Sequence, residues 1–169
     1  MGVSGAGKST IGRLLAKSLE YEFCDADELH PQHNVDLMAA GQPLNDEDRW
    51  PWLDAVGHRL EGNRAQDRGI VMACSALKRS YRDALREHVR DAFFVFLDGP
   101  MPVVHRRISD RKHEFMPPTL LASQYLSLEP LQGDEYGIRV DILQTPELMV
   151  ASITDALGSA ATAPDRRER

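Results

Sequence analysis

The sequence predicts an α/β fold, in which a parallel sheet carries helices on both faces. Short apolar stretches of strand length alternate along the chain with longer stretches in which apolar residues recur every three or four positions, the spacing of a helix with one buried face. The strand-like stretches are mostly apolar rather than alternating, which is typical of parallel strands covered on both sides. The 169 residues correspond to one domain with a single core.

The individual elements follow from these stretches in chain order. Strands are expected at 21–24, 70–74, 93–97 and 138–143. Helices are expected at 8–20, 34–40, 46–64, 78–88, 102–112, 119–128 and 146–157. Asn45 is a suitable N-cap for the third helix, and Gly41 ends the second. Residues 159–169 are small and polar and then charged, which predicts a disordered tail.

Composition excludes several classes of protein. There are 20 basic and 26 acidic residues, a net charge of -6, which argues against a nucleic-acid-binding protein because such proteins present a basic face. No apolar run approaches the length of a membrane span, and no signal peptide is recognisable. The two cysteines, Cys24 and Cys74, lie in strand-like stretches, so we expect reduced buried thiols and a cytoplasmic location.

A complete phosphate-binding loop, G-x-x-x-x-G-K-[ST], occupies residues 2–9. Its glycines let the backbone N–H groups point at phosphate oxygens, and the helix that follows offers its positive N-terminal end. Lys8 can reach the β- and γ-phosphates, while the Ser9 hydroxyl can bind Mg²⁺. We therefore expect ATP and Mg²⁺ to be held by Gly2, Val3, Ser4, Gly5, Ala6, Gly7, Lys8, Ser9 and Thr10.

Polar clusters follow the predicted strands. Asp25 and Asp27 come directly after the first visible strand, and the carboxyl ends of parallel strands line the ligand crevice. Two carboxylates there could hold Mg²⁺-bound water and accept a proton from an attacking hydroxyl, although Asp is also common in turns. Farther along the chain, Arg49 is a candidate carboxylate binder. Lys78 and Arg82 lie four residues apart, and both could point into the crevice from one helix face.

The segment 113–118 joins two predicted helices, contains two prolines, and follows a basic run that includes Arg107 and Arg111. In a phosphoryl-transfer enzyme, such a segment could close over the nucleotide, exclude water and bring cations to the migrating group. The alternative is a solvated basic helix end, which is favourable because cations suit a helix C-terminus.

Six motifs occur here in the order found in the small P-loop gluconokinases, which the sequence resembles over residues 2–157. They are the phosphate loop, D-A-D-E-L-H-P, G-Q-P-L-N-D-E-D-R-W-P-W-L, C-S-A-L-K-R-S-Y-R-D-A-L-R, L-L-A-S-Q-Y-L-S-L-E-P-L and V-D-I. The resemblance implies ATP-dependent phosphorylation of D-gluconate at its 6-hydroxyl, giving 6-phosphogluconate and ADP. It also implies a nucleoside-monophosphate-kinase-like sheet of order 2-3-1-4-5, a kinase domain at 1–158 with a lid at about 107–118, and a homodimer.

The resemblance also assigns roles to residues. Catalytic roles are expected for Lys8, Asp27 and Arg111, Mg²⁺ binding for Ser9 and Asp25, and contacts to ATP from the lid for Arg107 and Arg111. The gluconate-binding residues are expected to be Asp27, His30, Arg49, Lys78 and Arg82.

Two features depart from the family pattern. Relatives commonly read Arg-x-x-His-Phe in the lid, whereas this chain has His113 and Glu114 before Phe115, so Glu114 replaces the expected His. Family members also carry an apolar strand immediately before the phosphate loop. That strand would be central in the sheet, so we expect about six to twelve apolar residues ahead of Met1, the length of a strand with its lead-in.

Two alternatives remain at this stage. One is a kinase of another small sugar acid or of shikimate, which shares the loop and the lid. The other is a protein that binds nucleotide but catalyses poorly because its first strand and lid differ from the pattern. A substrate panel separates the first from gluconate phosphorylation, and nucleotide binding without turnover would identify the second.

Overall fold

A computed structural model describes residues 1–110 and 118–162. Its four strands are β1 (Glu22–Asp25), β2 (Ile70–Ala73), β3 (Phe94–Asp98) and β4 (Gly137–Asp141). Strand β1 pairs in parallel with β2, and β3 pairs in parallel with β4, so two separate two-stranded sheets are present in the described ranges. The four strands lie where the sequence places them, and the parallel arrangement is confirmed.

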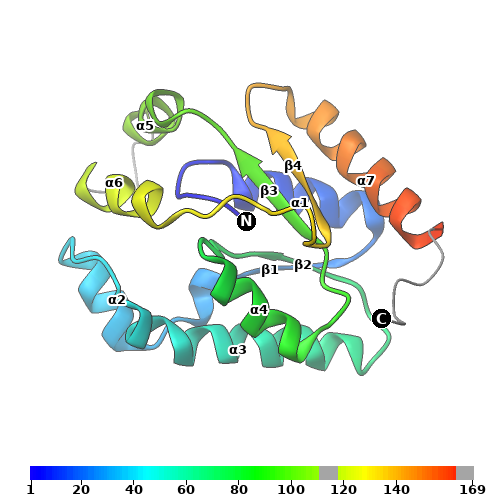
Figure 1. Ribbon diagram of the computed structural model, residues 1–169, viewed down its shortest axis with the longest axis horizontal. Helices are drawn as coiled ribbons and strands as arrows, with labels where there is room; N and C mark the ends of the chain where they lie inside the picture. The colour runs from blue at the N-terminus through cyan, green and yellow to red at the C-terminus, as the bar shows by residue number, and fades with distance from the viewer. Residues whose placement is uncertain (111–117, 163–169) are drawn as a thin grey trace.

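Helices cover both faces of these strands (Figure 1). They are α1 (Lys8–Leu19), α2 (Gln32–Ala39), α3 (Asp46–Arg64), α4 (Arg79–His88), α5 (Met101–Ser109), α6 (Pro118–Ser127) and α7 (Pro146–Thr162), with a short 3₁₀ helix η1 at Ala26–Leu29. Helices α1 and α7 pack together on one side, and α3 and α4 pack together on the other. None of the helices within the described ranges is long and apolar enough to cross a membrane.

The two sides of the sheets have separate apolar cores. One core joins α1, α7 and the paired strands β3 and β4, with Ile11, Leu97 and Ile153 among its buried members. The other joins α3 and α4 and contains Trp52 and Leu85. The division follows from the sequence, because parallel strands that are apolar on both faces require a helical layer on each.

Local signals set several helix boundaries. The Asn45 side chain accepts a hydrogen bond from the Asp48 backbone, and the Asp48 carboxylate accepts one from Asn45, each at 2.9 Å. This capping box begins α3 where the sequence predicts. Helix α7 differs, because it continues to Thr162, so residues 159–162 are helical and do not belong to the expected tail. Residues 163–169 lie outside the described residues.

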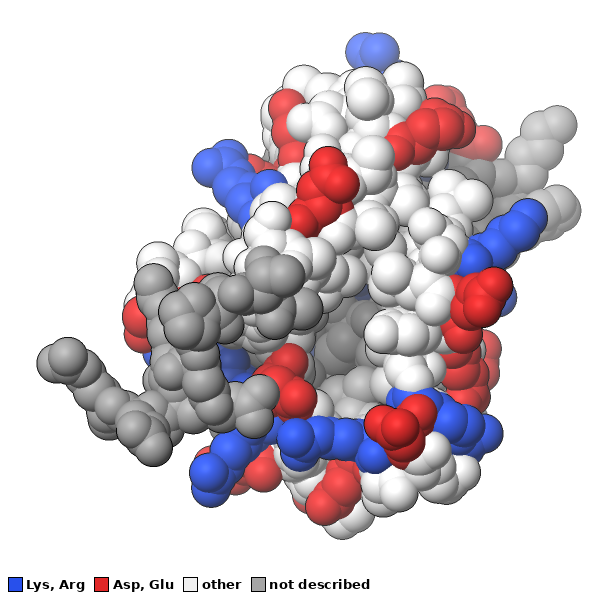
Figure 2. Space-filling model, turned by 90° about the vertical axis from the view of Figure 1, so that its right-hand side faces the viewer, with Lys and Arg blue, Asp and Glu red and all other residues white. Residues whose placement is uncertain are grey.

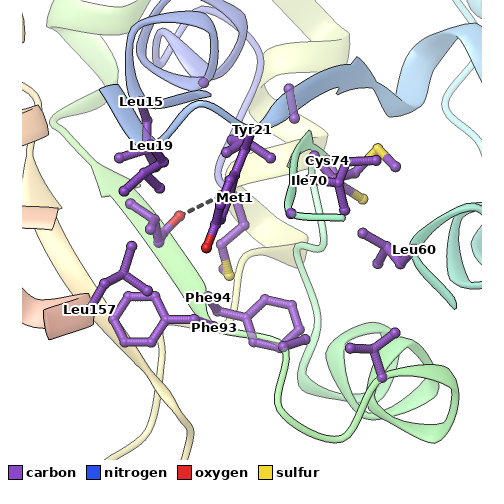
Figure 3. Close-up of a pocket in the computed structure, with 18 of the residues that line it drawn as sticks. Met1, Leu15, Leu19, Tyr21, Leu60, Ile70, Cys74, Phe93, Phe94 and Leu157 are labelled. Atoms are coloured by element: carbon purple, nitrogen blue, oxygen red, sulfur yellow. Dashed lines mark hydrogen bonds between the residues drawn. The ribbon is translucent and has the colours of Figure 1, made fainter. Parts of the chain in front are cut away.

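A slot separates β2 from β3, and Met1 lies at its inner end (Figure 3). The Met1 amino group donates to the Val95 carbonyl, the Leu97 N–H donates to the Met1 carbonyl at 3.0 Å, and the Gly2 N–H donates to Ser75 at 3.0 Å. Met1 is thus hydrogen-bonded to the residues on either side of Phe96, as a residue in a strand parallel to β3 would be. The sequence leads us to expect a further strand between β2 and β3, and in the described residues Met1 alone pairs in this way with the slot side of β3.

The slot forms a cavity of about 540 Å³ with a mostly apolar lining. Figure 3 shows Met1 between Phe93 and Phe94 on one side and Ile70 and Cys74 on the other. The molecule is hollowed on the face drawn in Figure 2, with charged side chains along the lower edge of the hollow. The slot therefore combines an apolar interior with two strand edges that face each other.

Candidate active site

The phosphate loop is a tight turn between the slot and α1, and its glycines are required by geometry. Gly2, Gly5 and Gly7 all have positive φ, at 133°, 78° and 101°. A Cβ on Gly2 would lie 2.7 Å from the Leu97 carbonyl oxygen, and one on Gly5 would lie 2.5 Å from Ile108. Gly7 is instead the N-cap of α1, where no side chain caps the helix. The first N–H groups of α1 are therefore placed to bind an anion.

The polar residues of the loop meet the first strand. The Ser9 hydroxyl donates to Asp25 Oδ2 at 2.6 Å, and Asp25 Oδ1 accepts from the Asp27 backbone N–H at 3.3 Å. The Lys8 ammonium group donates to the Val3 carbonyl at 3.1 Å. The structure thus brings together the loop lysine, the loop hydroxyl and the carboxylate that ends β1. An oxygen-only set from Ser9 and Asp25 suits Mg²⁺, which prefers hard oxygen ligands.

These residues surround a cavity of about 440 Å³. Its lining is polar and is shared between the loop and the end of β1, comprising Ser4, Gly5, Gly7, Lys8, Ser9, Asp25, Asp27 and Glu28. Val3 and Ala6 are buried beneath the loop, and Thr10 is exposed on α1. The two carboxylates predicted beside the phosphate loop therefore lie in the same cavity as the loop.

Beyond η1, His30 belongs to an aromatic stack. Its ring lies parallel to Trp52, with centroids 4.3 Å apart, and Asn34 Nδ2 lies 3.3 Å from His30 Nδ1. The Trp52 indole N–H donates to the Ala26 carbonyl at 2.7 Å, which ties α3 to η1. Burial of the His30 ring, with a further contribution from the positive charge of Arg49, lowers its pKa to about 4. His30 is therefore neutral near pH 7.

The start of α3 meets the start of α4 through a second polar group. Lys78 Nζ donates to both carboxylate oxygens of Asp46, at 2.6 and 2.8 Å, and the Tyr81 hydroxyl donates to Asp46 at 2.6 Å. The hydrogen bonds from Lys78 and then from Tyr81 lower the pKa of Asp46. Arg49 lies over the Tyr81 ring, 5.8 Å from its centroid, and donates to the Leu44 carbonyl at 3.4 Å.

Arg82 does not line the site, and this corrects the sequence expectation. Its side chain is fully buried, and it makes two charge-assisted hydrogen bonds to Glu135, at 2.6 and 2.7 Å. Burial alone would raise the pKa of Glu135, but hydrogen bonds from Arg82, the Gln132 backbone and Arg86 lower it to about 2. Carbonyl groups before α4 and after α6 accept from Arg82 Nη1, and the Pro130 carbonyl accepts from Nη2, which also donates to Glu135. The helical spacing with Lys78 is real, but tertiary packing turns the two side chains to different partners.

Only part of the expected lid lies within the described residues. Arg107 Nη2 donates to the Ile142 carbonyl at 2.7 Å, which ties α5 to the residue after β4. The expected lid residues Arg111, His113 and Glu114 lie outside the described residues, so their predicted roles stay predictions.

The sequence reasoning gave no role to two residues at the site. Glu28 lines the cavity, and the Gln124 side chain on α6 accepts a hydrogen bond from the Ser4 N–H at 2.7 Å. Glu28 follows Asp27 in the same cluster, so its position was a usable signal. Gln124 is 120 residues from Ser4, and a contact over that separation has no local signature.

The fold and this cavity define a phosphate-loop kinase. A sequence profile of the shikimate kinase family matches residues 4–129. The chain is 39% identical to the thermoresistant gluconokinase of Escherichia coli K12 over 158 residues, covering 93% of this chain and 90% of that protein. The chain therefore belongs to the gluconokinase family of phosphate-loop kinases.

Solved structures agree with this assignment. A gluconokinase from Sinorhizobium meliloti 1021 is 42% identical, with a TM-score of 0.87 over 95% of this chain and 90% of that one. An unliganded sugar kinase from Janibacter sp. HTCC2649 is also 42% identical, with a TM-score of 0.90 over 98% and 96% of the two chains. The phosphate-loop kinase fold expected from the sequence is thereby confirmed.

Proposed function

We propose that this protein transfers the γ-phosphoryl group of ATP to the 6-hydroxyl of D-gluconate. The observation that carries the proposal is the shared cavity, in which the phosphate loop faces the carboxylates of Asp25 and Asp27. Membership of the gluconokinase family and the names of its relatives in bacteria and eukaryotes support gluconate as the acceptor. Phosphoryl transfer requires little from the protein beyond positioning and charge neutralisation, and the cavity offers groups for both.

The residues around the cavity have separate roles in binding ATP and in phosphoryl transfer. Lys8 and the loop N–H groups hold the β- and γ-phosphate oxygens, while Ser9 and Asp25 hold Mg²⁺, which when bound neutralises charge on those oxygens. Asp27 accepts the proton of the 6-hydroxyl as that oxygen bonds to the γ-phosphorus. The bond from phosphorus to the bridging oxygen breaks, and ADP keeps that electron pair. Arg111, with Arg107, stabilises the charge from the lid.

Arg49 is our choice for the gluconate carboxylate. His30 is neutral near pH 7 because its pKa is about 4, so it offers a hydrogen bond rather than a charge. Lys78 already pairs with Asp46 and supports sugar hydroxyls from that position. The planar guanidinium of Arg49 suits a carboxylate. Kinases of other small sugar acids would use the same groups, so the acceptor must be tested directly.

We also propose that the slot holds a parallel strand joined to Met1. The bonds from Met1 to Val95 and Leu97 already have the spacing of a parallel rung, and the apolar slot continues beyond them. A strand there would join the two sheets into one, with the new strand between β2 and β3. If the new strand is counted as the first, the order of the sheet is 2-3-1-4-5. It would hold the phosphate loop against the sheet, which matters because catalysis depends on loop position.

The test is a coupled assay of ADP release with gluconate, shikimate, and no acceptor. Two chains are compared: residues 1–169, and the same chain with about five apolar β-branched residues added before Met1, the ordinary length of a strand. We expect gluconate-dependent turnover, highest in the extended chain. Turnover with shikimate but not with gluconate would show that shikimate, rather than gluconate, is the phosphoryl acceptor. ATP binding without any turnover in the extended chain would favour the catalytically impaired alternative.

We further propose a kinase domain over residues 1–158 with its lid at about 107–118, a cytoplasmic location and a homodimer. Both cysteines are free thiols, which suits a reducing compartment, and the dimer rests on the family resemblance. Light scattering tests the dimer: a mass near twice 18.9 kDa is expected, and the mass of one chain would contradict it.

A further inference from the structure

Two imidazoles and a carboxylate meet on the outer side of α3 and α4, apart from the phosphate-loop cavity. Asp54 and His58 are one helical turn apart on α3, and His88 is the last residue of α4. One ligand atom from each of the three lies within 4.8 Å of the others. The cluster is therefore formed by tertiary packing, because two helices contribute to it.

Two separations in this cluster match those between neighbouring metal ligands. Asp54 Oδ1 lies 3.3 Å from His88 Nε2, and Asp54 Oδ2 lies 3.4 Å from His58 Nδ1. His58 Nδ1 also lies 2.9 Å from the Asp54 backbone oxygen, so it exchanges that contact for the metal on binding. Metal–ligand bonds of about 2.0–2.1 Å place neighbouring ligands of a tetrahedron about 3.3–3.4 Å apart. The carboxylate thus stands at such a distance from both rings.

A second carboxylate lies behind His88. Glu61, one further turn along α3, has Oε2 3.7 Å from His88 Nδ1. A carboxylate at the second nitrogen of a ligating histidine fixes the ring orientation and raises its basicity. Here it lies on the Nδ1 side, while Nε2 is directed at Asp54.

Gly57 makes room for the His88 ring. This glycine is buried inside α3, and a Cβ there would lie 2.2 Å from His88 Cδ2. Glycine lowers the stability of a helix interior relative to alanine, so the room that the His88 ring occupies comes at the expense of helix stability. Gly62 on the same helix has nothing within 4 Å of its Cβ position. The two glycines differ because only Gly57 lies under an imidazole.

We propose that Asp54, His58 and His88 bind a divalent transition-metal ion, with Zn²⁺ as the probe of choice. Imidazole nitrogens with one carboxylate suit Zn²⁺, Ni²⁺ and Cu²⁺ rather than Mg²⁺. The site is therefore chemically distinct from the oxygen-only pair at Ser9 and Asp25. Asp54 and His58 are 63% and 64% exposed and His88 is 20% exposed, which leaves room for water at the remaining positions. Bound metal would join the end of α4 to the middle of α3, independently of any kinase activity.

The experiment is calorimetric titration of the full chain with ZnCl₂ in excess Mg²⁺, repeated with Co²⁺ to read tetrahedral coordination from its visible spectrum. We expect one ion per chain at this site. His58→Gln and His88→Gln should each weaken that binding at least tenfold, whereas His105→Gln, an exposed histidine on α5, should leave it unchanged. His58 is on the surface, so its variant keeps the fold, and circular dichroism checks each protein.

A glycine pair supplies the matched control. Gly57→Ala should displace the His88 ring and weaken Zn²⁺ binding, and Gly62→Ala should not. Absence of Zn²⁺ binding by the unaltered chain would overturn the proposal, and so would binding by His58→Gln and His88→Gln that is as tight as that of the unaltered chain. In that event, the contacts of Asp54 with His58 and His88 are ordinary polar contacts between neighbouring side chains.

Discussion

The phosphate-loop cavity and the slot both border the first residues of the chain. They differ in the interactions that keep the backbone around them in place. The cavity of about 440 Å³ is polar, and its loop is fixed by positive-φ glycines, by the N-terminus of α1 and by the Ser9–Asp25 hydrogen bond. The slot of about 540 Å³ is mostly apolar, and within the described ranges the hydrogen bonds that link its two edges come from Met1 and Gly2. Local geometry therefore keeps a binding loop formed, whereas continuity of the sheet requires a further strand.

The largest expected effect on stability is at Arg82, which lines neither cavity. This variant shows what a purely structural change does to the protein. Arg82→Ala removes the main partner of the buried Glu135 carboxylate and leaves it only Arg86 and the Gln132 backbone, and breaking a buried ion pair costs about 3–5 kcal/mol. We expect a large fall in the unfolding free energy, measured with urea, while the KM for gluconate changes little. A raised KM for gluconate with unaltered stability would instead show that Arg82 binds the substrate.

The same pair gives a pH dependence. The pKa of Glu135 is about 2 in the folded protein, below its ordinary value of 4.5, so its contribution to stability is complete above pH 4.5 and is lost as the pH falls toward 2. Urea unfolding from pH 6 to pH 2 should show this loss in the unaltered chain. The loss should be reduced in Glu135→Gln.

On the cavity side, Lys8→Ala should lower kcat about 10²–10³-fold, the usual effect of removing a group that stabilises transition-state charge. Stability should change far less than kcat, because the part-buried hydrogen bond from the Lys8 ammonium group to the Val3 carbonyl is of a kind that contributes about 0.5–1.5 kcal/mol. Lys17→Ala, an exposed lysine in the last turn of the same helix, is the control. Equal kcat values in the two variants would exclude Lys8 from the chemistry.

On the slot side, an added strand of about five residues should raise stability by a few kcal/mol, because each buried aliphatic side chain gains about 1.5–3 kcal/mol and each ordered residue costs about 1–2 kcal/mol. The thermal midpoint reports this gain. An extension of the same length made of glycine and serine is the control. If both extensions have the same effect, the slot does not accept a strand.

The amino group of Met1 provides a second test of the added strand, because it makes stability depend on pH. Burial, followed by the positive charge of Lys8, lowers the pKa of the Met1 amino group from 8.0 to about 5. The unfolded chain thus binds more protons between pH 5 and 8, and stability rises with pH across that window. The chain that begins at Met1 should show this rise, and the extended chain should not.

The smallest expected effect is at Gln124, which accepts from the loop at Ser4. Gln124→Ala should raise the KM for ATP about 2–10-fold, the equivalent of one hydrogen bond of about 0.5–1.5 kcal/mol. Ser123→Ala, whose hydroxyl donates within its own helix, is the control. An unchanged KM for ATP would mean that α6 does not support the loop.

Sequence reasoning was most successful where the signal is local. The loop, the helix caps and the strands depend on glycine conformation, hydrogen bonds between residues a few positions apart, and runs of apolar residues. The capping box from Asn45 to Asp48 and the paired carboxylates after β1 both lie within four residues. The position of Arg82 could not be predicted, because its partner Glu135 is 53 residues away and helical spacing does not specify which buried carboxylate a guanidinium will meet.

The sequence by itself determined the phosphate loop with its lysine and hydroxyl, because these follow from residue type and spacing. Its resemblance to a known family indicated the kinase class and the expectation of a central strand before the loop. Only the tertiary structure decided that Lys78 pairs with Asp46 while Arg82 is buried with Glu135. It also placed Gln124 against the loop and His88 over Gly57. The physical reason is that long-range pairs are chosen by how whole helices pack, and packing is a property of the assembled layers rather than of any single segment.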